Sequence, residues 1–312
     1  MRLIFAAFAT LLAASPALAA PKVIASVVPV HGIVSAVMGD KGQPELLLQG
    51  SMAEHRASFT PRQLGALGEA DLVFIVGQGL EAKLSQLSGT DAVNGKRFVM
   101  LADAPGVKTL PIRSGGAWEA HAHDEHGADE HADEHASEGI LTFDPHVWLD
   151  PENAKAMARQ VAASLSAADP ENAAAYEANA AAFAASVDAT SAAIAAELAP
   201  VKATPYVVFH DAYQYFEKRF GLSAAGSIAD VSARAPSAQR LGEVRDKILA
   251  VKAACVFREP QYDDKVVATV TEGTGAKEGV LDPLGADVPP GPEAYQQLLT
   301  KLGASLKACL AG

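Results

Sequence analysis

Residues 171–198 read ENAAAYEANAAAFAASVDATSAAIAAEL, a run of 28 residues that contains neither Gly nor Pro. Alanine has the highest intrinsic helix propensity, so the run predicts one helix of about 42 Å at 1.5 Å per residue. Asp169-Pro170 before it and Pro200 after it favour helix ends at both limits. A helix this long exceeds what one small domain needs, so we expect a rigid connector between two lobes.

On both sides of this run, short β-rich segments alternate with helical ones. That alternation is typical of α/β domains with a largely parallel sheet. Before the connector we expect strands at 23–28, 45–48, 71–76, 97–101 and 140–143, and helices at 31–38, from Thr60-Pro61 onward, at 80–87 and from Pro151. After it we expect strands at 206–209, 254–257 and 279–281, and helices at 212–220, 237–249, 265–271 and 292–308.

The predicted fold class is therefore α/β, with two lobes of mostly parallel sheet, one long rigid helix between them and a site in the interlobe groove. We divide the chain into a signal peptide (1–19), an N-terminal lobe (20–168), a connecting helix (169–199) and a C-terminal lobe (200–312).

The first 19 residues have the features of a Sec-type signal peptide. Met1-Arg2 provides a positive start, residues 3–12 are apolar apart from Thr10, and residues 17–19 read ALA, which fits the small-residue cleavage rule. The apolar run is too short to span a bilayer. We expect cleavage near Ala19 and a soluble, exported protein in a bacterial periplasm.

The chain is acidic, with 25 Lys and Arg against 37 Asp and Glu and a net charge of −12 over 312 residues. This balance argues against a nucleic-acid or an anionic-membrane partner, because both carry phosphate charge, and it favours cations. Residues 119–138 hold eight acids and no basic residue, which leaves −4 for the rest of the chain.

The same segment, 119–138, also holds five histidines and no large apolar residue. Such a segment cannot bury enough surface to offset its ordering entropy, so we interpret it as a mobile loop. It is either a solvated spacer or an auxiliary, weak trap for cations such as Zn²⁺. Its H-x-x-E-H match at 131–135 lacks an apolar helix face and is a chance match. The histidines are His121, His123, His126, His131 and His135.

Outside that segment four histidines remain, and three of them share a context. His55, His146 and His210 each follow an expected strand and precede an expected helix. Ligands bind beyond the carboxyl ends of strands in open α/β sheets, so the three side chains can converge on one crevice. Three neutral imidazoles suit Zn²⁺, with a carboxylate or water completing a tetrahedron. Glu54, beside His55, and Asp282, in a second-lobe loop, are the carboxylates best placed to supply it.

Two other features receive different assignments. His31 follows Pro29 at the start of the first expected helix, so we assign it to helix packing or to an outer shell of the site. Residues 77–82 read GQGLEA, which fits the G-x-G-x-x-G/A dinucleotide pattern after a strand. That strand is the third in the chain, and no substrate chemistry accompanies the pattern, so we do not assign a nucleotide.

The two cysteines, Cys255 and Cys309, both lie late in the chain. In an oxidising compartment an even pair favours a disulfide, which here would close a loop of about 55 residues. The chain-entropy model gives such a loop about 4 kcal/mol of stabilisation. Two buried free thiols are the alternative.

Six segments resemble the zinc-binding ZnuA-type periplasmic proteins of ABC importers, a metal-receptor family of solute-binding proteins. The resemblance runs over essentially the whole mature chain. The segments are GSMAEH (50–55), FDPHVWL (143–149), FHDAY (209–213), APSA (235–238), CVFREPQ (255–261) and LDPLG (281–285).

The resemblance implies two lobes bridged by a rigid helix, with Zn²⁺ held between them and handed to an inner-membrane ABC permease. Carried over residue by residue, it implies His55, His146 and His210 as ligands, with Glu54 or water as the fourth. An aspartate matching Asp282 ligates the metal in manganese-binding relatives, so Asp282 is an alternative or outer-shell residue.

The resemblance also implies a disulfide between Cys255 and Cys309. We expect a monomer, and an accessory periplasmic zinc chaperone as a further partner.

The leading hypothesis is a non-enzymatic, high-affinity periplasmic zinc receptor. One alternative is a zinc-dependent hydrolase that uses three His and a water, with Glu54 as general base. Another alternative is a manganese receptor, although three nitrogen ligands favour zinc because Mn²⁺ prefers a larger share of oxygen.

Overall fold

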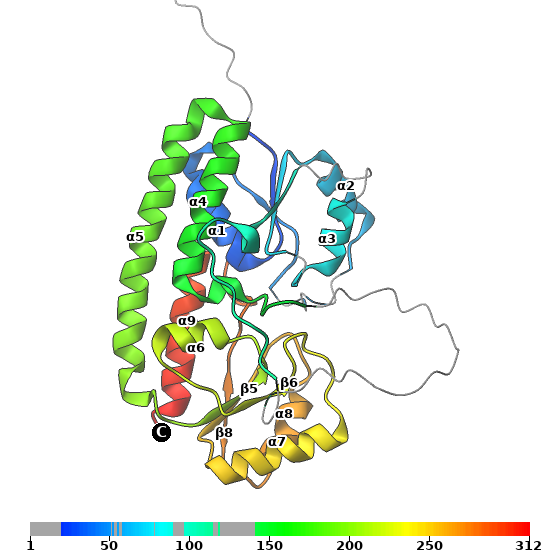
Figure 1. Ribbon diagram of the computed structural model, residues 1–312, viewed down its shortest axis with the longest axis vertical. Coiled ribbons are helices and arrows are strands. Elements are labelled where there is room, and N and C mark those ends of the chain that lie inside the picture. Colours follow the sequence, from blue (N-terminus) through cyan, green and yellow to red (C-terminus); the bar gives the residue numbers. More distant parts are fainter. Residues whose placement is uncertain are drawn as a thin grey trace, which may run out of the picture.

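The computed structural model describes residues 20–50, 52, 55, 58–77, 79–89, 97–114, 118 and 141–312. The predicted signal peptide, the acidic segment 119–138 and Glu54 lie outside the described residues. Two parallel sheets occupy the two halves of the molecule, and long helices run along one side of both (Figure 1).

The first sheet has four parallel strands in the order β2-β1-β3-β4. Its strands are β1 (Val23–Ala25), β2 (Glu45–Leu46), β3 (Leu72–Ile75) and β4 (Phe98–Met100). The central strands β1 and β3 are almost wholly buried, as expected for strands of a parallel sheet that is covered on both faces.

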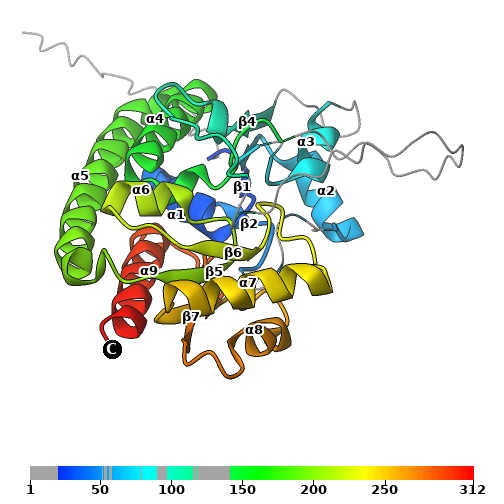
Figure 2. The same ribbon diagram turned by 60° about the horizontal axis from the view of Figure 1, so that its bottom comes forward.

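The second sheet repeats this arrangement in the order β6-β5-β7-β8, again with every pair parallel. Its strands are β5 (Tyr206–His210), β6 (Gly226–Ala229), β7 (Cys255–Arg258) and β8 (Lys277–Val280). Figure 2 shows helix α7 (Ala238–Val251) and helix α8 (Asp264–Thr271) beside this sheet. The predicted α/β class with parallel sheets is confirmed.

The remaining helices fall into two groups. Helices α1 (Val28–Met38), α4 (Pro151–Ala168), α5 (Ala173–Leu198) and α9 (Ala294–Leu310) pack against one another, whereas α2 (Pro61–Glu69), α3 (Ala82–Ser88) and α6 (Gln214–Phe220) are shorter. Single 3₁₀ turns are η1 (Gly39–Lys41), η5 (Leu101–Asp103), η6 (Val147–Leu149), η7 (Pro170–Asn172) and η8 (Ala199–Val201).

Helix α5 confirms the long helix expected from the alanine-rich run. It spans 26 residues, follows η7 and leads into η8. It runs past both halves of the molecule and packs on α4 and α9 (Figure 1). By length and composition alone this helix could cross a membrane. Its larger side chains, among them Tyr176, Phe183 and Ile194, are instead buried within the protein.

Helix starts were predicted well where the sequence supplies a cap. Thr60 caps α2 in a capping box with Gln63, and Ser237 caps α7 by accepting a hydrogen bond from the Arg240 backbone N–H. Helix α1 begins at Val28 rather than His31, because Pro29 fits the first turn of a helix.

Two expectations for strands were wrong. The described residues of the expected strand 140–143 form none. Asp144 N–H donates to Leu110 O (2.9 Å) just beyond this segment, but no strand within the described residues pairs with it. Conversely, β6 was not predicted, because its sequence GSIA (226–229) has little strand propensity and becomes a strand by pairing with β5.

The two halves share one apolar core and one covalent tie. Buried residues of the first sheet, such as Phe74, and of the second, such as Phe257, belong to the same cluster. The predicted disulfide between Cys255 and Cys309 is present and joins β7 to α9. Helix α9 also packs on α1 and α5, so the last segment of the chain contacts the first half. The predicted domain boundaries stay a prediction.

Candidate metal centre

The three histidines expected to converge come from different parts of the fold. His210 is the last residue of β5, at the carboxyl end of the second sheet. His146 immediately precedes η6, on the segment that leads into α4. His55 lies beyond β2 of the first sheet. The site therefore joins residues from both halves of the chain.

The structure brings these three side chains together. One ligand nitrogen from each of His55, His146 and His210 lies within 4.8 Å of the other two. Ring centroids are 5.5 Å apart for His55 and His146, 6.0 Å for His55 and His210, and 5.0 Å for His146 and His210. Among the described residues this is the one group of His, Cys, Asp or Glu side chains that could hold a metal ion. His146 and His210 are fully buried, and His55 is half-buried.

Carboxylates set the tautomers of the two buried imidazoles. His146 Nδ1–H donates to Asp144 Oδ1 (2.8 Å), and the same oxygen accepts the His146 backbone N–H (3.0 Å). His210 Nδ1–H donates to Glu259, at 2.7 Å from Oε2, and Tyr213 O–H also donates to Glu259 (3.0 Å). With the proton on Nδ1, each Nε2 presents a lone pair, as in the carboxylate–histidine–metal arrangement.

The electrostatic surroundings keep His146 neutral. Burial, followed by the nearby His210, lowers the pKa of His146 well below its ordinary value of 6.5. Burial also raises the pKa of Asp144 to about 7, although the His146 backbone N–H and Arg113 oppose this shift. A neutral imidazole is the form that binds a metal ion, so this centre is prepared for a cation.

The decisive contact is between the two Nε2 atoms of His146 and His210, which are 3.2 Å apart. Because both Nδ1 atoms donate to carboxylates, these two nitrogens face each other as acceptors. A cation between them removes this repulsion. Two Zn–N bonds of about 2.0–2.1 Å at a tetrahedral angle place the nitrogens about 3.3 Å apart, which matches this spacing.

The other predicted site residues have different positions. Asp282 Oδ1 accepts hydrogen bonds from the backbone N–H groups of Leu284 (3.0 Å) and Gly285 (2.9 Å) and from Gln261 Nε2 (2.8 Å). Its carboxylate thus holds its own loop together. Gln261 Nε2 also donates to Gly50 O (2.7 Å), on the segment before His55.

His31 lies in α1 and takes the packing role that was one of its two assignments. Its Nε2 lies 3.0 Å from Pro44 O, and its Nδ1 lies 3.2 Å from Ser35 Oγ. Glu54 and the five histidines of the acidic segment lie outside the described residues.

Sequence reasoning missed the polar residues behind the histidines. Asp144 and Glu259 lie in segments already noted for their resemblance, but their roles depend on tertiary contacts. Arg113 was also missed. Its guanidinium contacts Asp211, next to His210, and donates to Glu217 Oε2 (2.6 Å), so it ties the first half to the second.

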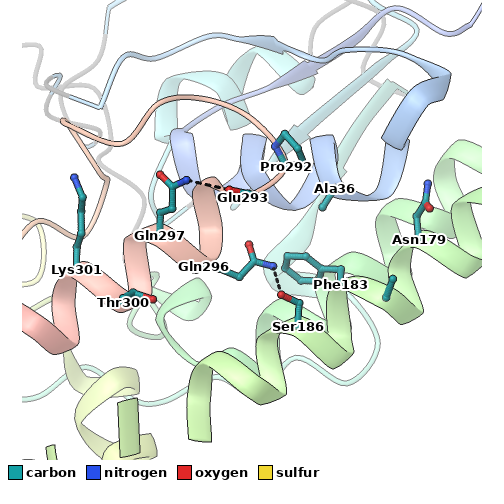
Figure 3. Close-up of a pocket in the computed structure, with 11 residues that line it drawn as sticks. Ala36, Asn179, Phe183, Ser186, Pro292, Glu293, Gln296, Gln297, Thr300 and Lys301 are labelled. Carbon is teal, nitrogen blue, oxygen red and sulfur yellow. Dashed lines mark hydrogen bonds between the residues drawn. The ribbon is translucent and has the colours of Figure 1, made fainter. Parts of the chain in front are cut away.

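Two cavities in the described part of the chain lie elsewhere. One, of about 680 Å³, lies between α1, α5 and α9, where Gln296 points to Ser186 (Figure 3). The other, of about 230 Å³, lies between α7 and the strands β5 and β6. Neither is lined by the three histidines, so neither would present a substrate to a metal held by them.

Comparison with known proteins agrees with this geometry. Residues 23–309 match the family described as ZnuA, zinc-uptake complex component A, periplasmic. The high-affinity zinc uptake system protein ZnuA of Brucella abortus (strain 2308) is 44% identical over 305 residues, which cover 92% of this chain and 91% of that protein. A crystal structure of ZnuA matches at TM-score 0.75 and 27% identity, over 93% of this chain and 99% of the other.

A further solved structure, a ZnuA deletion mutant with zinc bound, matches at TM-score 0.74 and 25% identity, over 93% and 98% of the two chains. The family match covers nearly the whole chain after its first 22 residues, and the relative from Brucella extends the agreement to sequence identity. The chain belongs to the ZnuA family of periplasmic zinc-uptake components.

Proposed function

We propose that the protein is a high-affinity periplasmic receptor that binds Zn²⁺ and delivers it to an ABC import permease. The observation that carries the proposal is the facing pair of Nε2 atoms in His146 and His210, each fixed by a buried carboxylate. His55 is the third ligand. Glu54 or a water molecule takes the fourth position, and Asp282 supports the segment before His55 through Gln261.

The family context supports this function in its coarser form. The family is one of zinc-uptake components in the periplasm, and the relative from Brucella is named as a high-affinity zinc uptake protein. Cleavage of the signal peptide near Ala19, a monomeric state and an accessory zinc chaperone remain parts of the proposal. The weak zinc-binding role of the acidic segment 119–138 also remains a prediction.

The alternatives are less well supported. The zinc hydrolase is not favoured because the matched family and its curated relatives are zinc-uptake proteins. A manganese receptor would be expected to present more oxygen ligands than three converging imidazoles provide.

The test is a Zn²⁺ titration of metal-stripped protein in competition with a chelator, for the wild type and for His146→Ala and His210→Ala. Structural zinc sites have binding free energies of about 10–16 kcal/mol. Divided among four ligands, this gives about 3 kcal/mol for one, so each variant is expected to bind at least about 100-fold more weakly.

His31→Gln is the matched control, because His31 is a buried histidine outside the cluster, and its zinc affinity should equal that of the wild type. Unchanged affinity in both alanine variants would contradict the site. Displacement of Zn²⁺ by an equal concentration of Mn²⁺ would support the manganese receptor instead.

A further inference from the structure

The turn formed by Gly77 and residues 79–81, which lies within the dinucleotide-like pattern, is already filled by a side chain of the protein. Glu81 is 3% exposed, and its Oε2 accepts the Gly77 backbone N–H at 2.9 Å. In a dinucleotide site this N–H group would face a phosphate. The carboxylate of Glu81 takes that place, so the pattern has another role here.

Glu81 joins the ends of two neighbouring strands. Its Oε1 accepts the Val76 backbone N–H (3.1 Å), just after β3, and the hydroxyl of Ser26, just after β1. Ser26 O in turn accepts the Leu48 N–H (2.8 Å), on the segment that continues to His55. A buried carboxylate with three donors is firmly held, because losing one bond would leave a buried charge poorly paired.

The two glycines of this turn are needed for different reasons. Gly77 has φ 143°, a conformation that favours glycine. Gly79 is not among the residues with positive φ, so backbone strain does not explain it. A Cβ at Gly79 would instead lie 2.9 Å from Pro145 Cβ and 3.2 Å from Leu141 Cδ2. Pro145 is the residue between Asp144 and His146.

We propose that the turn formed by Gly77 and residues 79–81 positions the metal ligand His146, with Glu81 as its anchor and Gly79 as its contact surface against Pro145. This inference rests on the proposed zinc site. Pro145 packs so closely against Gly79 that even one added carbon at Gly79 would press on its ring. His146 and its partner Asp144 are the residues on either side of that proline, so their positions depend on where Pro145 is held. Gly79 and Glu81 are positioning residues and touch no metal.

The first test enlarges Gly79. Gly79→Ala and Gly79→Val should push Pro145 away and weaken Zn²⁺ binding by about 10-fold and about 100-fold, the range seen when groups behind a metal ligand are altered. Substituting Co²⁺ adds a readout of geometry, because its visible d–d absorption should shift in both variants. Gly65→Ala is the matched control, since a Cβ at Gly65 in α2 meets nothing within 4 Å.

The second test loosens the anchor without changing the contact. Glu81→Gln keeps the size of the side chain but replaces one acceptor oxygen by an NH₂ group, which cannot accept from Gly77 or Val76. We expect zinc binding about 10-fold weaker and a shifted Co²⁺ spectrum. Glu81→Asp keeps both oxygens and should recover part of the loss. Glu272→Gln, at an exposed glutamate, should leave both readouts unchanged.

The outcomes separate this inference from the proposed function. If the wild type and Gly65→Ala bind no zinc at the histidines, the proposed function fails. If the wild type binds zinc, and folded Gly79→Ala and Glu81→Gln bind it with the same affinity and the same Co²⁺ spectrum, the positioning role is overturned. These two variants decide the matter if Gly79→Val does not fold.

Discussion

The two sheets have the same strand order, but different residues occupy the carboxyl ends of their two central strands. In each sheet the earliest strand, β1 or β5, lies between the next strand and the third, β3 or β7. At the ends of β1 and β3, the carboxylate of Glu81 accepts hydrogen bonds from the Ser26 hydroxyl and the Gly77 backbone N–H. At the ends of β5 and β7 lie His210 and Glu259, joined by a 2.7 Å hydrogen bond.

This position is the crevice where open α/β sheets bind ligands, at the point where the strand order reverses. In the first sheet the acid is satisfied by donors of the protein itself and takes the place that a phosphate would occupy in a dinucleotide site. In the second sheet the acid is satisfied by the imidazole of His210, whose Nε2 then faces Nε2 of His146. The same strand order therefore places a carboxylate that holds two strand ends together in one sheet and a carboxylate that orients a metal ligand in the other.

The largest expected effect comes from the disulfide, which belongs to the second sheet because it ties β7 to α9. Replacing both cysteines, Cys255→Ala with Cys309→Ala, should lower the free energy of unfolding by about 4 kcal/mol, the chain-entropy value for a loop of this length. Urea unfolding followed by tryptophan fluorescence measures the change. Zinc affinity under native conditions should change less than about threefold, since β5 and β7 remain paired.

Reduction of the wild-type protein serves as the control, because it breaks the same bond without altering any side chain volume. It should reproduce the loss of stability. A fall in zinc affinity as large as the fall in stability would show that the disulfide is needed to position His210 and Glu259. The pairing of β5 with β7 would then not be enough to hold them.

The carboxylates behind the two buried histidines give the next effect. Glu259→Gln and Asp144→Asn should each weaken zinc binding by about 10–100-fold, because outer partners orient the imidazole and raise its basicity. Glu259→Gln is expected to be the larger loss. Glu259 holds His210 from a neighbouring strand and is itself held by Tyr213, whereas Asp144 lies two residues from His146 on the same segment.

Zinc titration of the two variants measures this difference, with Glu243→Gln on the exposed side of α7 as the control. Equal, small losses below about threefold would mean that packing alone holds the imidazoles. A larger loss in Asp144→Asn would contradict this order. It would show that zinc binding depends more on the carboxylate behind His146 than on the one behind His210.

Much of this arrangement could be predicted from sequence, since local patterns determine it. The buried runs of β1 and β3, the caps Thr60 and Ser237 and the alanine-rich α5 are all local features. The three histidines could be grouped because each was expected to follow a strand in a fold whose strands end at one edge. That holds for His55 and His210, whereas His146 follows a segment whose described residues form no strand.

The partners of the histidines could not be predicted in the same way. Glu259 is 49 residues from His210, and the two meet because β5 pairs with β7, which is a property of the strand order. Arg113 reaches Asp211 across 98 residues from a segment that is not part of a strand, so no local pattern indicates this contact. The dinucleotide-like pattern, to which no nucleotide was assigned, differs in that the residue that fills its turn, Glu81, lies inside the pattern itself.

The smallest expected effect concerns His31, a buried histidine on the side of the first sheet with no place in the metal site. Burial lowers the pKa of His31 below its ordinary value of 6.5, although its hydrogen bond with Pro44 opposes this. As pH falls from 6.5 towards the lowered pKa, the unfolded chain binds a proton that the folded protein does not. His31 therefore reduces stability as pH falls through this window, by no more than about 1.4 kcal/mol per pH unit for one group.

Urea unfolding of zinc-free protein between about pH 5 and pH 7 measures this effect by comparing the wild type with His31→Gln. The glutamine amide can still donate to Pro44 O but does not titrate, so the variant should lose less stability towards low pH. His146 has a lowered pKa in both proteins and contributes equally to each curve. Parallel curves would show that His31 is protonated equally in the folded and unfolded states and makes no contribution to the pH dependence of stability.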